Sequence, residues 1–474
     1  MFMRTLSSTK YPWLLFIIVV VGLFSRWLSW PGFATHDTLF VTREAIAGQY
    51  TTYHPILNAL LVRIFAVPFE SYWLYTSLQI VFCCALFYRS LLHVFGNSRG
   101  YLLPLISTVI WAFSLPTALY LGMVWKDVPL AYSILFVGSL IYRVRREVDY
   151  KLALVDASLL GFSVFLVLGM RHGMIFNLLL IPVLFGLQRF CKDRRIWIPF
   201  AFAFVGFIGL QALSSSSIVR NDESHMLKLK ISASAQPFLA IVSNKNGYAS
   251  DDYGYDERLA RRAFGPDYAS DFTPDYFRNE IALNGESELE SVYTAILKRT
   301  PRLCATNFAQ CISARIQMLL STLQPSTSYG GMLFYDLGAL DSCETVFGMS
   351  LDQCVVLSEY EASEKLGSAV LLQKKLQSHF VESRSAFVKL VVWNLLPAIA
   401  LLLLIIVFAR SFSPIWMIAV FFGVQLVLPF LTSMANDFRY YYFLFLFAVL
   451  FGPAAFGELM SRVSGVRLKR FAGL

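Results

Sequence analysis

Residues 31–40, PGFATHDTLF, stand between two apolar stretches of different length. The stretch before them, residues 12–30 (PWLLFIIVVVGLFSRWLSW), is long enough to cross a hydrocarbon core of about 30 Å as a helix. The stretch after them, residues 54–66 (HPILNALLVRIFA), is amphipathic and too short to cross. We therefore expect a transmembrane helix, an outer loop that carries His36 and Asp37, and then a helix along the membrane surface. The apolar face of that surface helix is predicted to comprise Ile56, Leu57, Leu60, Leu61, Ile64 and Phe65.

The overall composition points to a membrane protein. The chain of 474 residues is 57% hydrophobic and only 15% charged, which soluble globular chains of this length are not. We expect an all-α polytopic membrane protein with about ten transmembrane helices. They are predicted at residues 12–30, 73–92, 102–121, 128–142, 152–170, 173–188, 196–213, 390–409, 414–432 and 441–460. The first has a basic flank like that of a signal peptide, but no small-residue cleavage site follows it, so we interpret it as a retained helix.

Lys and Arg are distributed unequally between the two predicted sides of the membrane. If the N-terminus is cytoplasmic, that side carries 17 Lys and Arg residues, and the short loops on the other face carry five. This bias predicts that both termini lie in the cytoplasm. The net charge of +9 then follows from topology, with a contribution to anionic lipid binding, and requires no nucleic-acid partner.

Residues 214–388 differ in composition from the rest of the chain. They carry 16 Lys and Arg against 21 Asp and Glu, although the whole chain is basic. We expect a soluble, α-rich periplasmic domain between an N-terminal transmembrane part (1–213) and a C-terminal one (389–474). Its four cysteines indicate up to two disulfides in an oxidising compartment, and their spacing leaves the pairing open. They are Cys304, Cys311, Cys343 and Cys354.

Two local predictions concern this periplasmic domain. Apolar residues at helical spacing predict a helix over residues 305–323, ending before Pro325, whose apolar face packs into the domain or lies on the membrane. The segment 247–276, GYASDDYGYDERLARRAFGPDYASDFTPDY, is rich in Asp, Tyr, Gly and Pro, a composition typical of loops and turns.

Ionisable residues gather in four turns on the predicted outer face. They are His36, Asp37, Arg43, Glu44 and His54 in the first outer loop (31–72), Lys126 and Asp127 in GMVWKDVP (122–129), Arg171 and His172 in MRHG (170–173), and Asp437, Arg439 and Tyr440 in NDFRYY (436–441). The cytoplasmic loops carry Arg and Lys without this mixture. Because a charge at membrane depth is costly to desolvate, such a gathering predicts a functional site, and its cations suit the phosphate of an anionic lipid.

Each of these residues also has a structural interpretation. Arg171 or Arg439 alone would serve as an anchor to lipid headgroups. Lys126 and Asp127 would neutralise each other at a tight turn, and His54 would cap the following helix. These separate explanations give no reason for carboxylates, histidines and cations to share one face, so we favour a common site.

The order of the short motifs resembles that of a known superfamily. PGFATHD, GQYTTYHPIL, WKDVPLA, RHG and DFRYYYF, together with an acidic residue after the first transmembrane helix, resemble the GT-C integral-membrane glycosyltransferases. Among these, the chain is similar to the bacterial serotype-converting glucosyltransferases that modify O-antigen. It differs from many GT-C proteins in having a single Asp preceded by His in place of a paired-acid motif, which leaves metal use open.

The resemblance implies transfer of a hexose such as glucose, on the periplasmic side, from a polyprenyl-phosphate donor to a glycan such as the O-antigen of lipopolysaccharide. It also implies a flippase and a polyprenyl-phosphate sugar synthase upstream. Asp37 is expected to act as the base of an inverting transfer, assisted by His36. The expected phosphate ligands are Lys126, Arg171, Arg439, His54 and His172, supported by Asp127, Asp437 and Tyr440. No cofactor is certain, and a divalent metal ion is an alternative.

Two other classes of function remain open. A secondary transporter would place its charges near the middle of the bilayer, between repeated halves, and this sequence shows no repeat. An O-antigen polymerase or ligase would use a lipid-diphosphate donor and rely on arginines of the large outer segment. Those arginines are Arg258, Arg261, Arg262 and Arg278.

Overall fold

The computed structural model describes residues 11–33, 36–51, 54–96, 100–147, 149–171, 173–220, 223–244, 248, 252–266, 268, 287–322, 367–376, 395–432 and 438–471. The α-helices are α2 (Pro12–Ser29), α3 (His36–Ala47), α4 (Ile56–Phe65), α5 (Trp73–Phe95), α6 (Leu102–Phe113), α7 (Leu115–Tyr120), α8 (Asp127–Arg146), α9 (Leu154–Gly169), α10 (Asn177–Phe185), α11 (Leu187–Lys192), α12 (Arg194–Ser214), α13 (Glu223–Val242), α14 (Tyr253–Phe264), α16 (Ser287–Thr306), α17 (Phe308–Thr322), α21 (Gly367–Leu376), α23 (Leu396–Phe408), α24 (Pro414–Thr432) and α25 (Tyr442–Phe471). The short 3-10 helices are η1 (Val67–Phe69), η2 (Met174–Phe176) and η6 (Phe438–Tyr441), and the strands are β1 (Tyr50–Thr51) and β2 (Val219–Arg220).

Within these residues, six helical segments are long and apolar enough to cross a membrane. They are α2, α5, α8, α12, most of α24, and η6 with the first part of α25. The other four predicted transmembrane segments form shorter apolar helices, namely α6, α9, η2 with α10, and α23. The segment predicted as one helix over residues 102–121 is divided because Ser114 is extended and its side chain caps α7. The described part of the chain is thus mostly helical, with apolar helices typical of a membrane protein.

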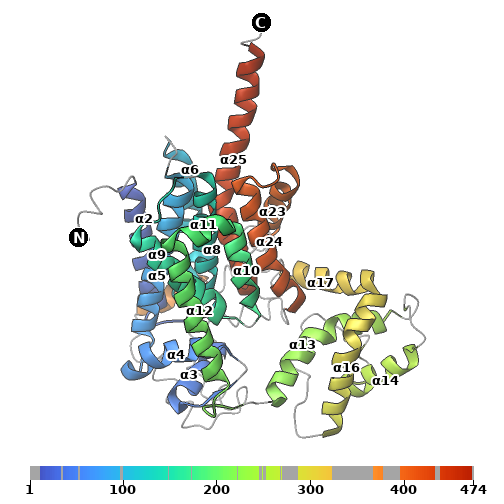
Figure 1. The fold of residues 1–474 in the computed structure, drawn as a ribbon. Coiled ribbons are helices and arrows are strands. Elements are labelled where there is room, and N and C mark those ends of the chain that lie inside the picture. The colour runs from blue at the N-terminus through green and yellow to red at the C-terminus, as the bar shows by residue number, and fades with distance from the viewer. Residues whose placement is uncertain are drawn as a thin grey trace.

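The centre of the helical bundle is α8. It packs against α5, α9, α24 and α25, and is buried along almost its whole length. Gly138 of α8 lies so close to Phe422 of α24 that a Cβ there would come within 2.8 Å of the ring. By contrast, α12 contacts mainly α9 and buries few of its apolar side chains. In Figure 1, α25 carries the C-terminus away from the bundle at the end opposite α3 and α4.

Two helices, α3 and α4, cover that opposite end (Figure 1). The segment that carries Asp37 forms helix α3, where the sequence predicts a loop. The predicted surface helix is α4, which packs against α3 and α5. Ile56 and Leu57 of its predicted apolar face are buried in the protein. Ala59 and Val62 are buried, whereas Ile64 is 56% exposed. The parallel pair β1–β2, which joins Tyr50 to Val219, ties this end to the segment after α12.

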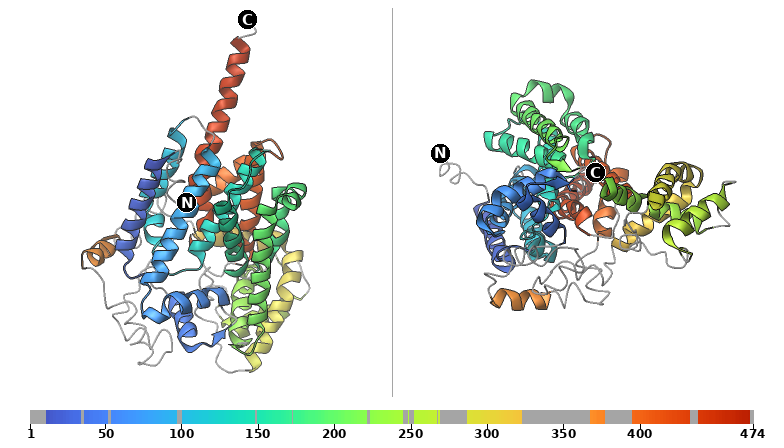
Figure 2. Two further views of the ribbon diagram at one scale, coloured as in Figure 1. Left: turned by 60° about the vertical axis from the view of Figure 1, so that its left-hand side comes forward. Right: turned by 90° about the horizontal axis from the view of Figure 1, so that it is seen from below.

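The helices α13, α14, α16 and α17 form a separate unit with its own apolar core (Figure 2). It contacts the bundle where α13 and α17 meet α24. Helix α17 confirms a helix in the region predicted over 305–323, although α16 occupies the first part of that range. Phe308, Ile316 and Leu320 of α17 are exposed, so its apolar face is only partly packed within the unit.

The prediction of loops and turns over residues 247–276 is wrong for its middle part, which forms α14. The reason is the side-chain pattern of that part: Leu259, Ala260, Ala263 and Phe264 recur at helical spacing and are buried against the unit's core. Gly265, at a φ of +89°, ends the helix where a side chain would be strained.

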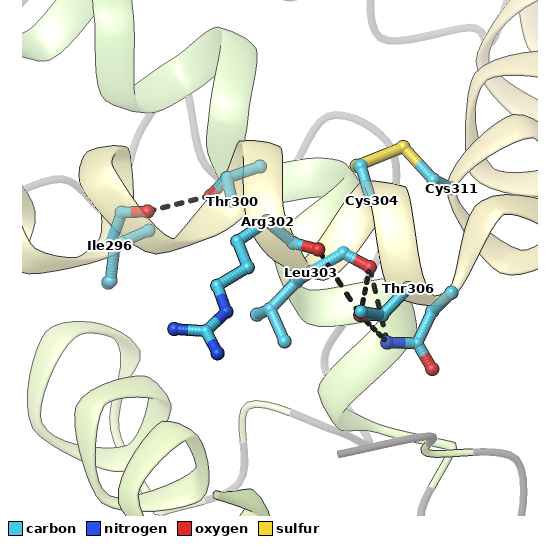
Figure 3. Close-up of a disulfide and its surroundings, with 8 residues drawn as sticks. Ile296, Thr300, Arg302, Leu303, Cys304, Thr306 and Cys311 are labelled. Carbon is cyan, nitrogen blue, oxygen red and sulfur yellow. Dashed lines mark hydrogen bonds between the residues drawn. A yellow bond between two sulfur atoms is a disulfide. The ribbon is translucent and has the colours of Figure 1, made fainter.

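One disulfide is present among the described residues. It joins Cys304 near the end of α16 to Cys311 on α17, and so connects two consecutive helices (Figure 3). This is one of the pairings that the sequence left open. Cys343 and Cys354 lie outside the described residues.

Candidate functional site

The closest contact between the predicted site residues is an ion pair. Nη1 of Arg439, on η6, lies 2.5 Å from Oδ2 of Asp37, in the first turn of α3. The two residues are 402 positions apart in the sequence, and their side chains are 7% and 15% exposed. The fold therefore brings the first outer turn and the last one into direct contact.

The third component of the site is the loop before α8. Phe33 donates its N–H to the carbonyl of Gly122 and accepts from the N–H of Val124, which forms a short parallel bridge. The hydroxyl of Thr38 donates to the carbonyl of Val124 at 2.9 Å. Gln79 of α5 donates to two further carbonyls in this loop. These bonds fix the loop beside Asp37.

Aromatic rings surround the Arg439 guanidinium. Its Cζ lies 4.8 Å from the centroid of Trp125 and 5.1 Å from that of Tyr440. Arg171 places its own Cζ 5.0 Å from the Tyr440 ring. Cation–π contacts of this kind stabilise a guanidinium while leaving its N–H groups directed to other partners. Two guanidinium groups thus converge on Tyr440, from segments that follow α9 and α24.

Lys126 and Asp127 occupy the start of α8, directly after Trp125. Nζ of Lys126 lies 3.8 Å from Oδ2 of Asp127, within ion-pair range but too far for a hydrogen bond. The Asp127 side chain is 4% exposed, and neither of its oxygens accepts a hydrogen bond from the part of the chain that the structure describes. Partial neutralisation by Lys126 agrees with the structural interpretation, but it leaves both carboxylate oxygens without donors.

The other predicted residues are placed only in part. His54 is buried just before α4, and His36 begins α3. His172 and Asp437 lie outside the described residues, as does Arg278 of the rival polymerase interpretation. The other three arginines of that interpretation, Arg258, Arg261 and Arg262, lie on α14, where Arg261 is half exposed and pairs with Glu257 at 2.9 Å.

Glu44 is a titratable group on the same helix as Asp37. Burial raises the pKa of Glu44 from its usual value of 4.5 to about 7, although hydrogen bonds from Thr51 oppose this shift. Both the N–H and the hydroxyl of Thr51 donate to Oε1 of Glu44, which connects α3 to β1. Glu44 therefore has donors for its carboxylate, and titrates near neutral pH.

Two buried residues of this region were not predicted from the sequence. Trp125 stands within the motif GMVWKDVP, in which the charge pattern indicates Lys126 and Asp127 but gives no signal for the tryptophan. Arg315 interrupts the apolar stripe of α17, between Ile312 and Ile316, and a cation within such a stripe was an available signal. It is 5% exposed, and burial lowers its pKa to about 10, an effect partly opposed by Tyr441 of η6.

The described residues contain no group of three or more His, Cys, Asp or Glu side chains arranged to hold a metal ion. The chain matches no family model, no curated protein and no solved structure.

Proposed function

We propose that this chain is a bacterial inner-membrane glycosyltransferase of GT-C type. It takes a hexose from a polyprenyl-phosphate donor and transfers it to a surface glycan such as O-antigen. In this proposal ten helices cross the membrane and both termini are cytoplasmic. The unit of α13, α14, α16 and α17 lies in the periplasm, on the same side as Asp37 and Arg439.

The observation that carries the proposal is the convergence of Arg171 and Arg439 on the ring of Tyr440, at 5.0 and 5.1 Å. Lys126 and Asp127 directly follow Trp125, whose ring contacts the Arg439 guanidinium, so the candidate site combines three cations with the carboxylates of Asp37 and Asp127. A guanidinium binds a phosphate through two parallel hydrogen bonds, and a phosphate on a lipid chain would reach this place from the bilayer.

The same groups suit the chemistry of transfer. When the bond between the sugar and the phosphate breaks, the leaving phosphodiester becomes a phosphomonoester and its negative charge increases. Cations that are already fixed in position stabilise this increase more than they stabilise the bound donor. The acceptor hydroxyl must also lose a proton to a base, for which the site offers the carboxylates Asp37 and Asp127.

Binding of undecaprenyl phosphate tests the phosphate assignment without knowledge of the sugar. The intact protein in nanodiscs should bind it, and should bind undecaprenol, which lacks the phosphate, far more weakly. Arg439→Gln and Arg171→Gln should each weaken binding about 10-fold or more, the effect of losing a charged hydrogen bond. Arg261→Gln on α14 is the matched control and should bind like the intact protein. Equal binding by all four proteins would overturn the proposal.

Transfer itself is tested in membranes given polyprenyl-phosphate carrying a radiolabelled hexose, with lipopolysaccharide as acceptor. Label should move from lipid to glycan when the intact protein is present, and should remain on the lipid with Arg439→Gln. Equal loss of folded protein and of transfer in that variant would instead favour the interpretation of Arg439 as a membrane anchor.

A further inference from the structure

We infer that Asp127 is the catalytic base of the site, and that Asp37 is a positioning residue for Arg439. This inference rests on the proposed function and reverses the roles that the sequence suggested for the two carboxylates. It depends on a difference between Asp127 and the other buried carboxylates.

Buried carboxylates elsewhere in the described chain accept hydrogen bonds. Asp156 accepts from Arg89 and Tyr150, Glu44 from Thr51, and Asp256 from Tyr248 and Arg299. Asp127 is equally inaccessible at 4% exposure, yet neither of its oxygens accepts a hydrogen bond from any described residue.

A buried carboxylate without donors is costly, since it has lost the hydrogen bonds that it made to water. Lys126 at 3.8 Å and the amino end of α8 reduce this cost by their charge, but they do not occupy the oxygen lone pairs. The open positions on Asp127 are what a base needs in order to accept a hydroxyl proton. They fit a ligand hydroxyl that replaces the missing donors.

The location of Asp127 meets the second requirement, closeness to the reacting phosphate. Trp125, two residues earlier, lies against the Arg439 guanidinium, and the carbonyl of Val124 accepts from Thr38, the neighbour of Asp37. Asp127 also begins α8, the most buried helix of the bundle, so its backbone is held in a rigid element. A base on such an element keeps a constant position relative to the cations.

Asp37 is less suited to take the proton. Its Oδ2 lies 2.5 Å from Nη1 of Arg439, and this pair holds the guanidinium against the rings of Trp125 and Tyr440. Protonation of Asp37 would remove the charge that holds Arg439 at the moment when the growing phosphate charge requires that guanidinium in place. Asp37 is therefore better suited to orient Arg439 than to act as the base.

In the proposed step, Asp127 takes the proton of the acceptor hydroxyl while the sugar is transferred. The oxygen of the acceptor hydroxyl forms a bond to the anomeric carbon while its proton passes to a carboxylate oxygen of Asp127. The bond between the anomeric carbon and the phosphate oxygen breaks, and its electron pair leaves with polyprenyl phosphate. The Asp127 carboxyl afterwards releases the proton to water, which restores the starting state.

The deciding experiment measures undecaprenyl-phosphate binding and hexose transfer on the same nanodisc preparations. Asp127→Asn should bind within about 3-fold of the intact protein but transfer about 10²–10⁴-fold more slowly at saturating donor, the usual contribution of a general base. Asp37→Asn should show the opposite pattern, with binding weakened about 10-fold and most of the loss in transfer recovered at high donor concentration. Glu257→Gln on α14 is the matched carboxylate control and should change neither quantity.

Three outcomes overturn the inference. If Asp127→Asn transfers hexose at the rate of the intact protein, Asp127 is not the base, and the proposed function still stands. Asp127→Asn that loses binding and transfer equally makes Asp127 a phosphate-positioning residue. An intact protein that neither binds nor transfers overturns the proposed function as well. Should Asp127→Asn fail to fold, Asp127→Glu carries the test: its displaced carboxylate should slow transfer without weakening binding, and unchanged transfer would contradict the inference.

Discussion

Two arginine–carboxylate pairs lie toward opposite ends of the bundle and are built differently. In the inner pair, Arg89 of α5 donates two hydrogen bonds, of 2.7 and 2.5 Å, to the two oxygens of Asp156 on α9. Tyr150 donates to the same carboxylate, and Nε2 of His93 lies 3.4 Å from it. In the outer pair, Arg439 approaches Asp37 through Nη1, and the rings of Trp125 and Tyr440 lie against the guanidinium, whose Nη2 also donates to the Tyr440 hydroxyl.

The difference indicates different uses. Asp156 is fully buried and surrounded by donors, and its partners come from α5 and from the turn before α9, so the inner pair locks neighbouring helices together. The outer pair joins segments from the two ends of the chain, and the loop that contacts it leads to Asp127, whose oxygens accept no hydrogen bond from any described residue. A polar cluster whose bonds are complete stabilises a fold, whereas one with open positions is suited to a ligand.

The largest expected effect breaks the inner pair. Asp156→Asn removes the charge while Arg89 stays partly buried, and should lower the free energy of unfolding by about 3–5 kcal/mol. The measurement is SDS titration of the purified protein in mixed micelles. Ser158→Ala, an exposed position on the same helix, is the control and should change stability by less than about 0.5 kcal/mol. Wild-type stability in Asp156→Asn would remove the distinction between the two pairs.

The second effect concerns the outer pair, where function rather than stability should suffer. Arg439→Gln should slow hexose transfer about 10²–10³-fold, the usual cost of losing a group that stabilises transition-state charge. Because Asp37 acts through Arg439, combining Asp37→Asn with Arg439→Gln should cost scarcely more than Arg439→Gln alone. Additive losses in transfer would mean that the two residues act independently.

Much of the bundle follows from the sequence, since an apolar run of transmembrane length leaves few alternatives to a helix. All ten predicted transmembrane segments contain helices, although four of these helices are short. The prediction was poorer where composition and periodicity disagreed. In α14 the Asp, Tyr and Gly content outweighed the helical spacing of Leu259 and Phe264, and in α4 the buried face depended on neighbouring helices.

The residues of the candidate site can be selected from the sequence, but the contacts between them cannot. The outer position of Asp37 and Arg439 follows from the predicted topology, but no spacing rule pairs residues 402 positions apart. The lack of hydrogen bonds to Asp127 from the described residues could not be predicted either, because its sequence neighbour Lys126 suggests a satisfied ion pair. The different hydrogen-bond partners of Asp37 and Asp127 follow from the packing of the loop before α8, which the sequence does not show.

A third prediction tests how strongly the outer site depends on packing of that loop. A Cβ at Gly122 would lie 2.0 Å from Oγ and 2.2 Å from Cβ of Ser29, so Gly122→Ala must displace the loop from α2. It should cost about 1–3 kcal/mol of stability in the SDS titration and weaken undecaprenyl-phosphate binding. Adding Ser29→Gly should restore both properties. Gly209→Ala on α12, where a Cβ meets nothing within 4 Å, is the control, and equal losses in both alanine variants would exclude this contact as the cause.

A fourth prediction separates the unit of α13, α14, α16 and α17 from the bundle. Replacing Cys304 and Cys311 by Ser removes a bond that closes a short loop, and should destabilise the unit by about 2 kcal/mol. Hydrogen exchange should therefore increase in α16 and α17 and remain unchanged in α5 and α8. Increased exchange in α8 would show that the unit and the bundle unfold together.

The smallest expected effect comes from Glu44, which differs from the Asp156 carboxylate in having few donors for its buried charge. Because burial raises the pKa of Glu44 to about 7, the folded protein retains a proton that the unfolded chain loses near its usual pKa of 4.5. The stability that Glu44 contributes is complete below about pH 4.5 and is lost as the pH rises through about 7. Between about pH 5.5 and 6.5 the apparent unfolding temperature should fall by about 2 °C from this group. Glu44→Gln should flatten that slope and Glu257→Gln should not, so an unchanged slope in Glu44→Gln would assign the titration to another group.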